Sequence, residues 1–111
     1  MIFYTNRPVP SGAAACARGP FIFIRPKYRG DVGLLEHERV HVKQCYRTLG
    51  IHAFLYLLSK RYRLNAEVEA YRAQARYYAD DRRPLFARFI CDKYGLSVSY
   101  AEVLAALRAP A

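Results

Sequence analysis

The sequence after residue 30 is dominated by helix start and stop signals, which restricts the chain to a mainly helical fold. Capping residues precede apolar segments of helical period, and glycine or proline residues separate these segments. The signals predict helices at about 31–49, 51–61, 65–80, 84–95 and 99–108. Asp31 and Asn65 are the expected N-caps of the first and third helices, and Ser99 and Glu102 form a capping box before the last. The second helix is mostly apolar, so we expect it to be buried.

Strand signals are confined to the N-terminal part of the chain. Residues 21–25 are aromatic and β-branched and stop at Pro26, and residues 2–4 predict a second short strand. Residues 11–17 are small and predict a loop. Because an isolated hairpin is marginally stable, these strands should pack on helices. The expected fold is α+β: one mainly helical domain over residues 1–111, with a short N-terminal β-hairpin or sheet.

Composition limits the class of protein. A chain of 111 residues allows one domain, and a hydrophobic content of 53% supports a folded core and excludes a disordered tail. No apolar run approaches the roughly 20 residues of a membrane span, and the N-terminus lacks the pattern of a secretion signal. The cysteines, Cys16, Cys45 and Cys91, are odd in number and far apart, which predicts reduced thiols. These features together predict a cytoplasmic protein.

The net charge is +9, from 18 Lys and Arg against 9 Asp and Glu. Such a charge is compatible with a polyanionic partner, either nucleic acid or a membrane surface. The arginines are scattered along the chain, however, and they greatly outnumber the lysines, as a GC-rich gene would produce by default. We therefore expect no specific binding of nucleic acid.

Residues 37–41 read His-Glu-Arg-Val-His and lie inside the first predicted helix. Positions i and i+4 of a helix share a face, so His37 and His41 can bind one metal ion. Glu38 is offset by one residue, so it can reach a water molecule on the metal without being a ligand, as a general base must. The alternative is a helical histidine pair packed against aromatic residues, with Glu38 in solvent.

A zinc site of this kind needs a third protein ligand. His52 lies beyond Gly50, so we expect a core or surface histidine there and not a metal ligand. Cys45 is too far from His37 along the helix axis to bind the same ion. Two carboxylates, Glu67 and Glu69, are the remaining candidates. Both are expected in the first turn of the third helix, where the helix dipole alone would favour acidic residues.

The pattern resembles that of the gluzincin zinc metallopeptidases, in which a His-Glu-x-x-His helix is followed by a helical Glu-x-x-Ala. Here the second half is residues 67–70, and the length is similar to that of the single-domain minigluzincins. The resemblance implies one Zn²⁺ per chain, held by His37, His41 and Glu67. It also implies that Glu38 deprotonates a zinc-bound water. Glu69 remains the alternative to Glu67 as the third ligand.

The side chains that contact the metal ligands differ in part from those of the gluzincins. Many relatives have Asp after the alanine, as a partner of a metal ligand, whereas this chain has Tyr71. Gln44 lies on the histidine side of its helix and can either hold a ligand or remain a plain surface residue.

The resemblance further implies a minimal zincin-like fold with an edge strand above the metal-binding helix, where substrate binds in an extended form. The strand expected in this role is formed by Phe21, Ile22, Phe23 and Ile24. The implied activity is that of a zinc metalloendopeptidase, a hydrolase acting on a peptide or protein substrate. Two alternatives remain: a basic helical module that binds nucleic acid or protein, with structural zinc or none, and a zincin that is latent or inactive.

Overall fold

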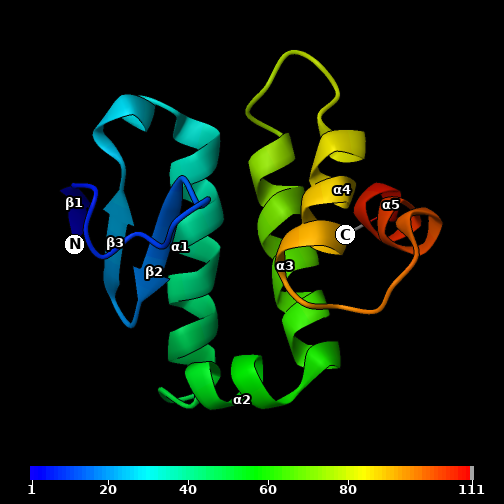
Figure 1. The fold of residues 1–111 in the computed structure, drawn as a ribbon, viewed down its shortest axis with the longest axis horizontal. Helices are drawn as coiled ribbons and strands as arrows, with labels where there is room; N and C mark the ends of the chain where they lie inside the picture. The colour runs from blue at the N-terminus through cyan, green and yellow to red at the C-terminus, as the bar shows by residue number, and fades with distance from the viewer. Residues whose placement is uncertain (111) are drawn as a thin grey trace.

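The structure is a computed structural model and describes residues 1–110. Its elements in chain order are β1 (Ile2–Tyr4), β2 (Ala15–Arg18), β3 (Phe21–Ile24), a 3₁₀ turn (Pro26–Tyr28), α1 (Val32–Arg47), α2 (His52–Leu58), α3 (Lys60–Ala75), α4 (Arg83–Lys93) and α5 (Tyr100–Arg108). Figure 1 shows the sheet, α1, α3 and the pair α4 and α5 following one another across the molecule. The predicted α+β, mainly helical fold is confirmed. Within residues 1–110, no helix is long and apolar enough to cross a membrane.

The three-stranded sheet has the order β1-β3-β2, so β3 is its central strand. β1 pairs with β3 in parallel, with Ile2 opposite Ile22, and β2 pairs with β3 in antiparallel, with Ala15 opposite Ile24. The prediction that Phe21–Ile24 forms an edge strand is therefore wrong. Both sides of its backbone are already paired, because β3 lies between β1 and β2.

β2 lies in the segment predicted to be a loop. Its sequence, Ala-Cys-Ala-Arg, contains no β-branched or aromatic residue and so has little intrinsic strand propensity. Pairing with β3 and packing against α1 form this strand. The edge strand that contacts α1 is thus β2, which local sequence preference does not reveal.

Side-chain caps define several of the helix ends. Asp31 accepts a hydrogen bond from Leu34 N (3.0 Å) at the start of α1, and Ser99 accepts one from Glu102 N (3.1 Å) at the start of α5. These two starts are confirmed. The expected cap at Asn65 is wrong, because Ser59 caps α3 by accepting from Tyr62 N (3.1 Å). The third helix therefore begins at Lys60, and Glu67 lies near its middle.

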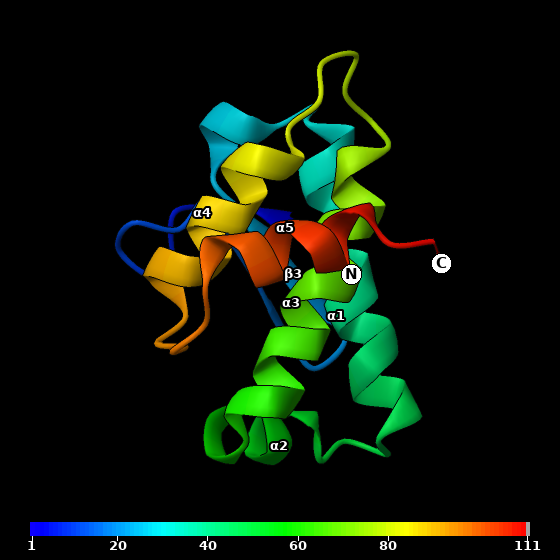
Figure 2. The ribbon, with the colours of Figure 1, turned by 90° about the vertical axis from the view of Figure 1, so that its right-hand side faces the viewer.

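α2 crosses the ends of α1 and α3, as Figures 1 and 2 show. The prediction that this apolar helix is buried is wrong: Phe54, Leu57 and Leu58 are 69%, 71% and 81% exposed. α2 has only seven residues and lies at the end of the helix pair, so only one of its faces can contact the rest of the protein.

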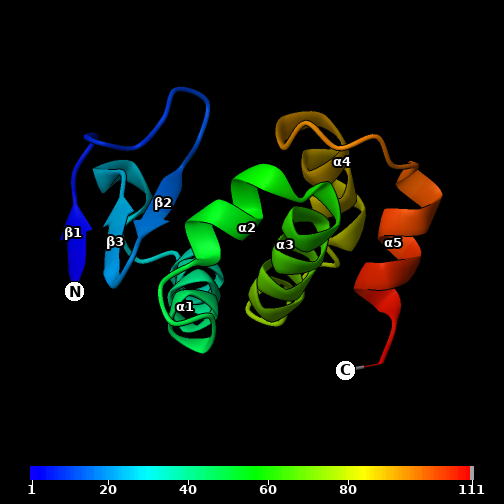
Figure 3. The ribbon, with the colours of Figure 1, turned by 90° about the horizontal axis from the view of Figure 1, so that it is seen from below.

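The main apolar core lies between α3, α4 and α5, which Figure 3 shows grouped on one side of α1. Its buried members are Val68, Tyr71, Phe86, Ala87, Ile90, Leu96, Val103 and Leu107. α1 packs on α3 from the opposite side and carries the sheet on its outer face. The contact between α1 and α3 therefore joins the N-terminal and C-terminal halves of the protein.

Candidate metal centre

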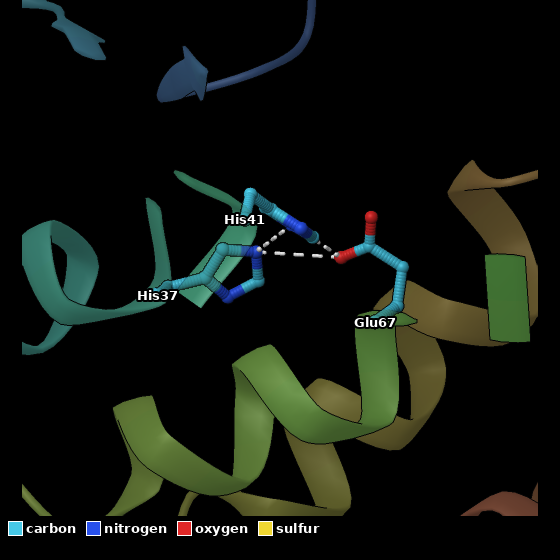
Figure 4. A group of neighbouring side chains, drawn as sticks. All are labelled: His37, His41 and Glu67. Carbon is cyan, nitrogen blue, oxygen red and sulfur yellow. Dashed lines mark hydrogen bonds and ion pairs between the residues drawn. The ribbon is translucent and has the colours of Figure 1, made fainter. Parts of the chain in front are cut away.

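Two helices bring together the side chains predicted to bind metal. His37 and His41 lie one turn apart on the face of α1 that packs against α3, and Glu67 faces them from α3. Figure 4 shows the two imidazoles and the carboxylate pointing toward one another. Their side chains are only 5%, 11% and 2% exposed, respectively. The cluster lies within the contact that joins the two halves of the molecule.

The three candidate ligand atoms form a nearly equilateral triangle. His37 Nε2 and His41 Nε2 are 3.2 Å apart, and Glu67 Oε1 is 3.3 Å from each. Zinc–ligand bonds of about 2.0–2.1 Å at tetrahedral angles separate two ligand atoms by about 3.3–3.4 Å. Within residues 1–110, Glu67 Oε1 is also buried without a hydrogen-bond donor. The triangle thus has the size and the donor set that a zinc ion requires, so these three residues could hold one.

Burial and charge compete within this cluster. Burial opposes the charged form of each group, but the His41 side chain holds the pKa of Glu67 well below its usual range. Burial likewise lowers the pKa of His41, yet the Glu67 carboxylate outweighs it and raises that pKa to about 9. A buried carboxylate between two imidazoles therefore needs a positive charge beside it, supplied either by a proton or by a metal ion.

Glu38 lies beside the triangle without being part of it. Its Oε2 is 4.0 Å from His37 Nε2, and its side chain is 7% exposed. Burial raises the pKa of the Glu38 carboxyl, and the neighbouring histidines only partly oppose this. A carboxylate with a raised pKa, close to the three clustered side chains but not among them, is suited to accept a proton.

Gln44 determines which nitrogen of His41 faces the cluster. Its amide nitrogen donates to Ala66 O (3.1 Å) and to Glu69 Oε1 (3.0 Å). Its amide oxygen must therefore accept, and His41 Nδ1 donates to it at 2.9 Å. With the proton on Nδ1, the lone pair of Nε2 is available to a metal ion. Gln44 thus holds His41, a candidate ligand, in place, in agreement with one of the two predicted alternatives.

Tyr56 of α2 was not predicted to contribute to the site. Its hydroxyl donates a short hydrogen bond to Glu67 Oε2, which leaves Oε1 directed at the histidines. A single tyrosine in an apolar helix carries no sequence signal for this role. His52 lies one turn away, where its Nδ1 is 2.7 Å from the Tyr62 hydroxyl, and its ring is 6.0 Å from that of His41.

Tyr71 packs edge-on against His37, with ring centres 4.3 Å apart. Its hydroxyl lies 2.7 Å from the hydroxyl of Tyr94 and not near the imidazole. Within the part of the chain that the structure describes, His37 Nδ1 is buried without a hydrogen-bond partner. Among the described residues, Tyr71 therefore contacts His37 by ring packing and not by a hydrogen bond.

Glu69, the alternative ligand, does not belong to the cluster. Its side chain is 48% exposed and forms an ion pair with Arg47 (2.7 Å). Neither Glu67 nor Glu69 lies in the first turn of α3, so the helix dipole does not account for them. Cys16, Cys45 and Cys91 are free, half-buried thiols.

No family model, curated protein or solved structure matches this chain. The functional assignment therefore depends on the arrangement of the residues themselves.

Proposed function

We propose that this protein is a zinc-dependent metallopeptidase in which His37, His41 and Glu67 hold one zinc ion and Glu38 is the general base. The observation that carries the proposal is the triangle of ligand atoms, 3.2–3.3 Å on each side, with an uncoordinated buried carboxylate next to it. This arrangement resembles the gluzincin pattern in residue type, order and spacing.

Zinc bound there would lower the pKa of a water ligand and polarise the peptide carbonyl. The chain's own groups supply the proton transfers. The Glu38 carboxylate accepts the proton of the attacking water and delivers it to the leaving amine nitrogen. Its burial supports this role, because a raised pKa makes it a stronger base.

The β2 strand is a better candidate than β3 for binding an extended peptide. It pairs with β3 along one side and packs against α1, which carries the two histidines. A peptide added to its other side would gain backbone hydrogen bonds with little side-chain selectivity. The substrate class that fits such a surface is an extended, unstructured segment of polypeptide.

A latent zincin is the second candidate. The burial of the site favours it: His37, Glu38 and Glu67 are 4%, 5% and 2% exposed, so a substrate carbonyl needs the surrounding elements to move. The free cysteines fit a reducing compartment such as the cytoplasm for either form.

Replacement of Glu38 by Gln tests the proposed mechanism. Glu38→Gln keeps the size of the side chain but removes the base, so hydrolysis of casein by the zinc-loaded protein should fall by about 10²-fold or more. Zinc content, measured by elemental analysis after dialysis, should stay at one per chain because the ligands are untouched. If wild-type turnover is too slow for casein, self-cleavage during long incubation is followed by mass spectrometry.

Glu36→Gln is the matched control, since Glu36 lies on the same helix and pairs with the exposed Arg39 at 2.9 Å. It should change neither zinc content nor turnover. Undiminished turnover in Glu38→Gln would refute the mechanism, and loss of zinc in that variant would make Glu38 a ligand instead of a base.

A further inference from the structure

Large exposed apolar side chains gather at one end of the molecule. They belong to α2 and to the turn that precedes it, and Figures 1 and 2 both show α2 at the extreme end of the fold. We call them the α2 patch: Leu49, Ile51, Phe54, Leu57 and Leu58, which are 93%, 53%, 69%, 71% and 81% exposed. Large apolar side chains exposed on one short element and the turn before it are typical of an interaction site in a folded protein.

The helix that carries the patch is firmly attached. Its inner face contributes Tyr56, which donates a hydrogen bond to Glu67. Arg63 of α3 holds the last turn of α2 by donating to Tyr56 O (2.8 Å) and Leu57 O (2.9 Å). The apolar side chains of α2 therefore face outward because the other face of the helix is anchored to α3, and not because the helix is detached.

Positive charge surrounds the patch, and negative charge is missing from it. Residues 39–66 contain no Asp or Glu. Lys60 and Arg61, at the start of α3, are exposed and form no ion pair within residues 1–110. Arg63 donates to backbone carbonyls and forms no ion pair with an acid of the described chain. Arg47, at the end of α1, forms an ion pair with Glu69.

We propose that the α2 patch docks on the surface of an anionic lipid bilayer. The aliphatic and aromatic side chains would enter the boundary between headgroups and acyl chains, while Lys60 and Arg61 contact lipid phosphates. Nucleic acid would satisfy the cations but would leave Phe54 and the leucines without an apolar environment. A second copy of the chain would satisfy the apolar residues but would bring like charges together.

Vesicle sedimentation tests the apolar part of the proposal. Wild-type protein should sediment with vesicles of phosphatidylcholine and phosphatidylglycerol, and far less with phosphatidylcholine alone. The double variant Phe54→Ser/Leu58→Ser should bind the anionic vesicles at least about tenfold more weakly, because it removes two inserted side chains. The control is Leu85→Ser, which alters an exposed leucine of α4 outside the patch (44% exposed) and should bind like wild type.

The charged part has its own matched pair of variants. Lys60→Glu/Arg61→Glu should lower binding to the anionic vesicles by about tenfold or more. Arg76→Glu/Arg88→Glu makes the same change in net charge at exposed positions outside α2 and should have a much smaller effect. Added salt should weaken the binding of the wild type to vesicles. It should remove the preference for anionic lipid at a lower concentration than it removes the remaining binding.

Three outcomes would overturn the proposal. One is failure of the wild type to bind anionic vesicles, and another is equal loss of binding in the patch variants and their controls. The third is a dimer, seen by analytical ultracentrifugation, that Phe54→Ser/Leu58→Ser dissociates while vesicle binding is unchanged. Because vesicle binding is measured without turnover or metal, it is independent of the proposed peptidase function.

Discussion

Two glutamates separated by one residue on α3 have different surroundings because they project from different faces of the helix. Glu67 is 2% exposed and faces the histidines of α1. Glu69 is 48% exposed and pairs with Arg47 at the surface. Surface ion pairs of this kind contribute about 0–1 kcal/mol to stability, whereas a metal ligand is essential to its site.

Glu67→Gln and Glu69→Gln are therefore a matched pair for the third ligand. Loss of a ligand's hydrogen-bond partner lowers metal affinity by about 10- to 100-fold. We expect Glu67→Gln to lower zinc affinity by more than this, because it changes the ligand itself. Glu69→Gln should stay near wild type, since it touches the ligands only through Gln44. Competition with a chromophoric chelator measures both affinities. Equal affinities in the two variants, or the reverse order, would contradict the assignment of Glu67.

Some parts of the site were predictable from the sequence, and others were not. The roles predicted for His37, Glu38 and His41 depend on spacing within one helix, which is local information. Glu67 lies on another helix, so the preference for it over Glu69 depended on the resemblance to gluzincins, with helix geometry in agreement. Tyr56 joins the site because α2 crosses the ends of two helices, and that crossing depends on packing at long range.

At the level of elements, prediction succeeded where a capping side chain acts alone. Asp31 and Ser99 start helices because each accepts a backbone hydrogen bond three residues ahead. It failed where two signals compete: Ser59 and Asn65 are both good caps, and the extended backbone of Ser59 separates α2 from α3. β2 was missed because its partner strand, and not its own composition, makes it a strand.

The close approach at the start of α1 predicts an unusual effect of adding one methyl group. A Cβ on Gly33 would lie 2.7 Å from the ring and hydroxyl of Tyr78. That hydroxyl donates to Asp31 Oδ1 (2.7 Å) and accepts from Gln74 Nε2 (2.9 Å), so it cannot move freely. Gly33→Ala should therefore destabilise the protein by about 1–3 kcal/mol, although Ala is the better helix former.

Urea denaturation of a double-mutant cycle separates the two contributions. In a Tyr78→Ala background the added methyl group has space, so Gly33→Ala should be neutral or stabilising there. A cost that is the same in both backgrounds would show that contact with Tyr78 is not its cause.

At the scale of the whole molecule, the net charge of +9 comes mainly from arginines scattered along the sequence. We expect binding of DNA or RNA that is weak and that decreases steeply between low and physiological salt, since it depends on phosphate contacts alone. Fluorescence anisotropy with labelled duplexes and single strands, measured over a salt series, checks this. Sub-micromolar, sequence-selective binding at physiological salt would favour the nucleic-acid-binding alternative.

The candidate metal centre also lies where the two halves of the protein meet. The histidines belong to α1, which carries the sheet, and Glu67 belongs to α3, which is packed in the helical core. Zinc bound between them should therefore stabilise the whole fold, by an amount that depends on its affinity and concentration.

The pH dependence of this stabilisation can be predicted from His41. Its pKa is raised from 6.5 to about 9, so in the zinc-free protein its ion pair with Glu67 contributes fully below pH 6.5. That contribution is lost as the pH rises toward about 9. Zinc needs neutral His41 and must displace its proton, so the apparent zinc affinity should rise by about tenfold per pH unit over the same interval.

The melting temperatures of chelator-dialysed and zinc-loaded protein between pH 6.5 and 9 should therefore diverge. The zinc-free value should fall with pH, because the His41 ion pair is lost, and the increment due to zinc should grow, because fewer protons compete. His41→Ala should abolish both trends, whereas His52→Ala, which alters a half-buried histidine outside the ligand set, should keep both. An increment that is independent of pH in the wild type would mean that zinc does not displace the His41 proton. In that case the buried pair between His41 and Glu67 would stabilise the fold without being a metal site.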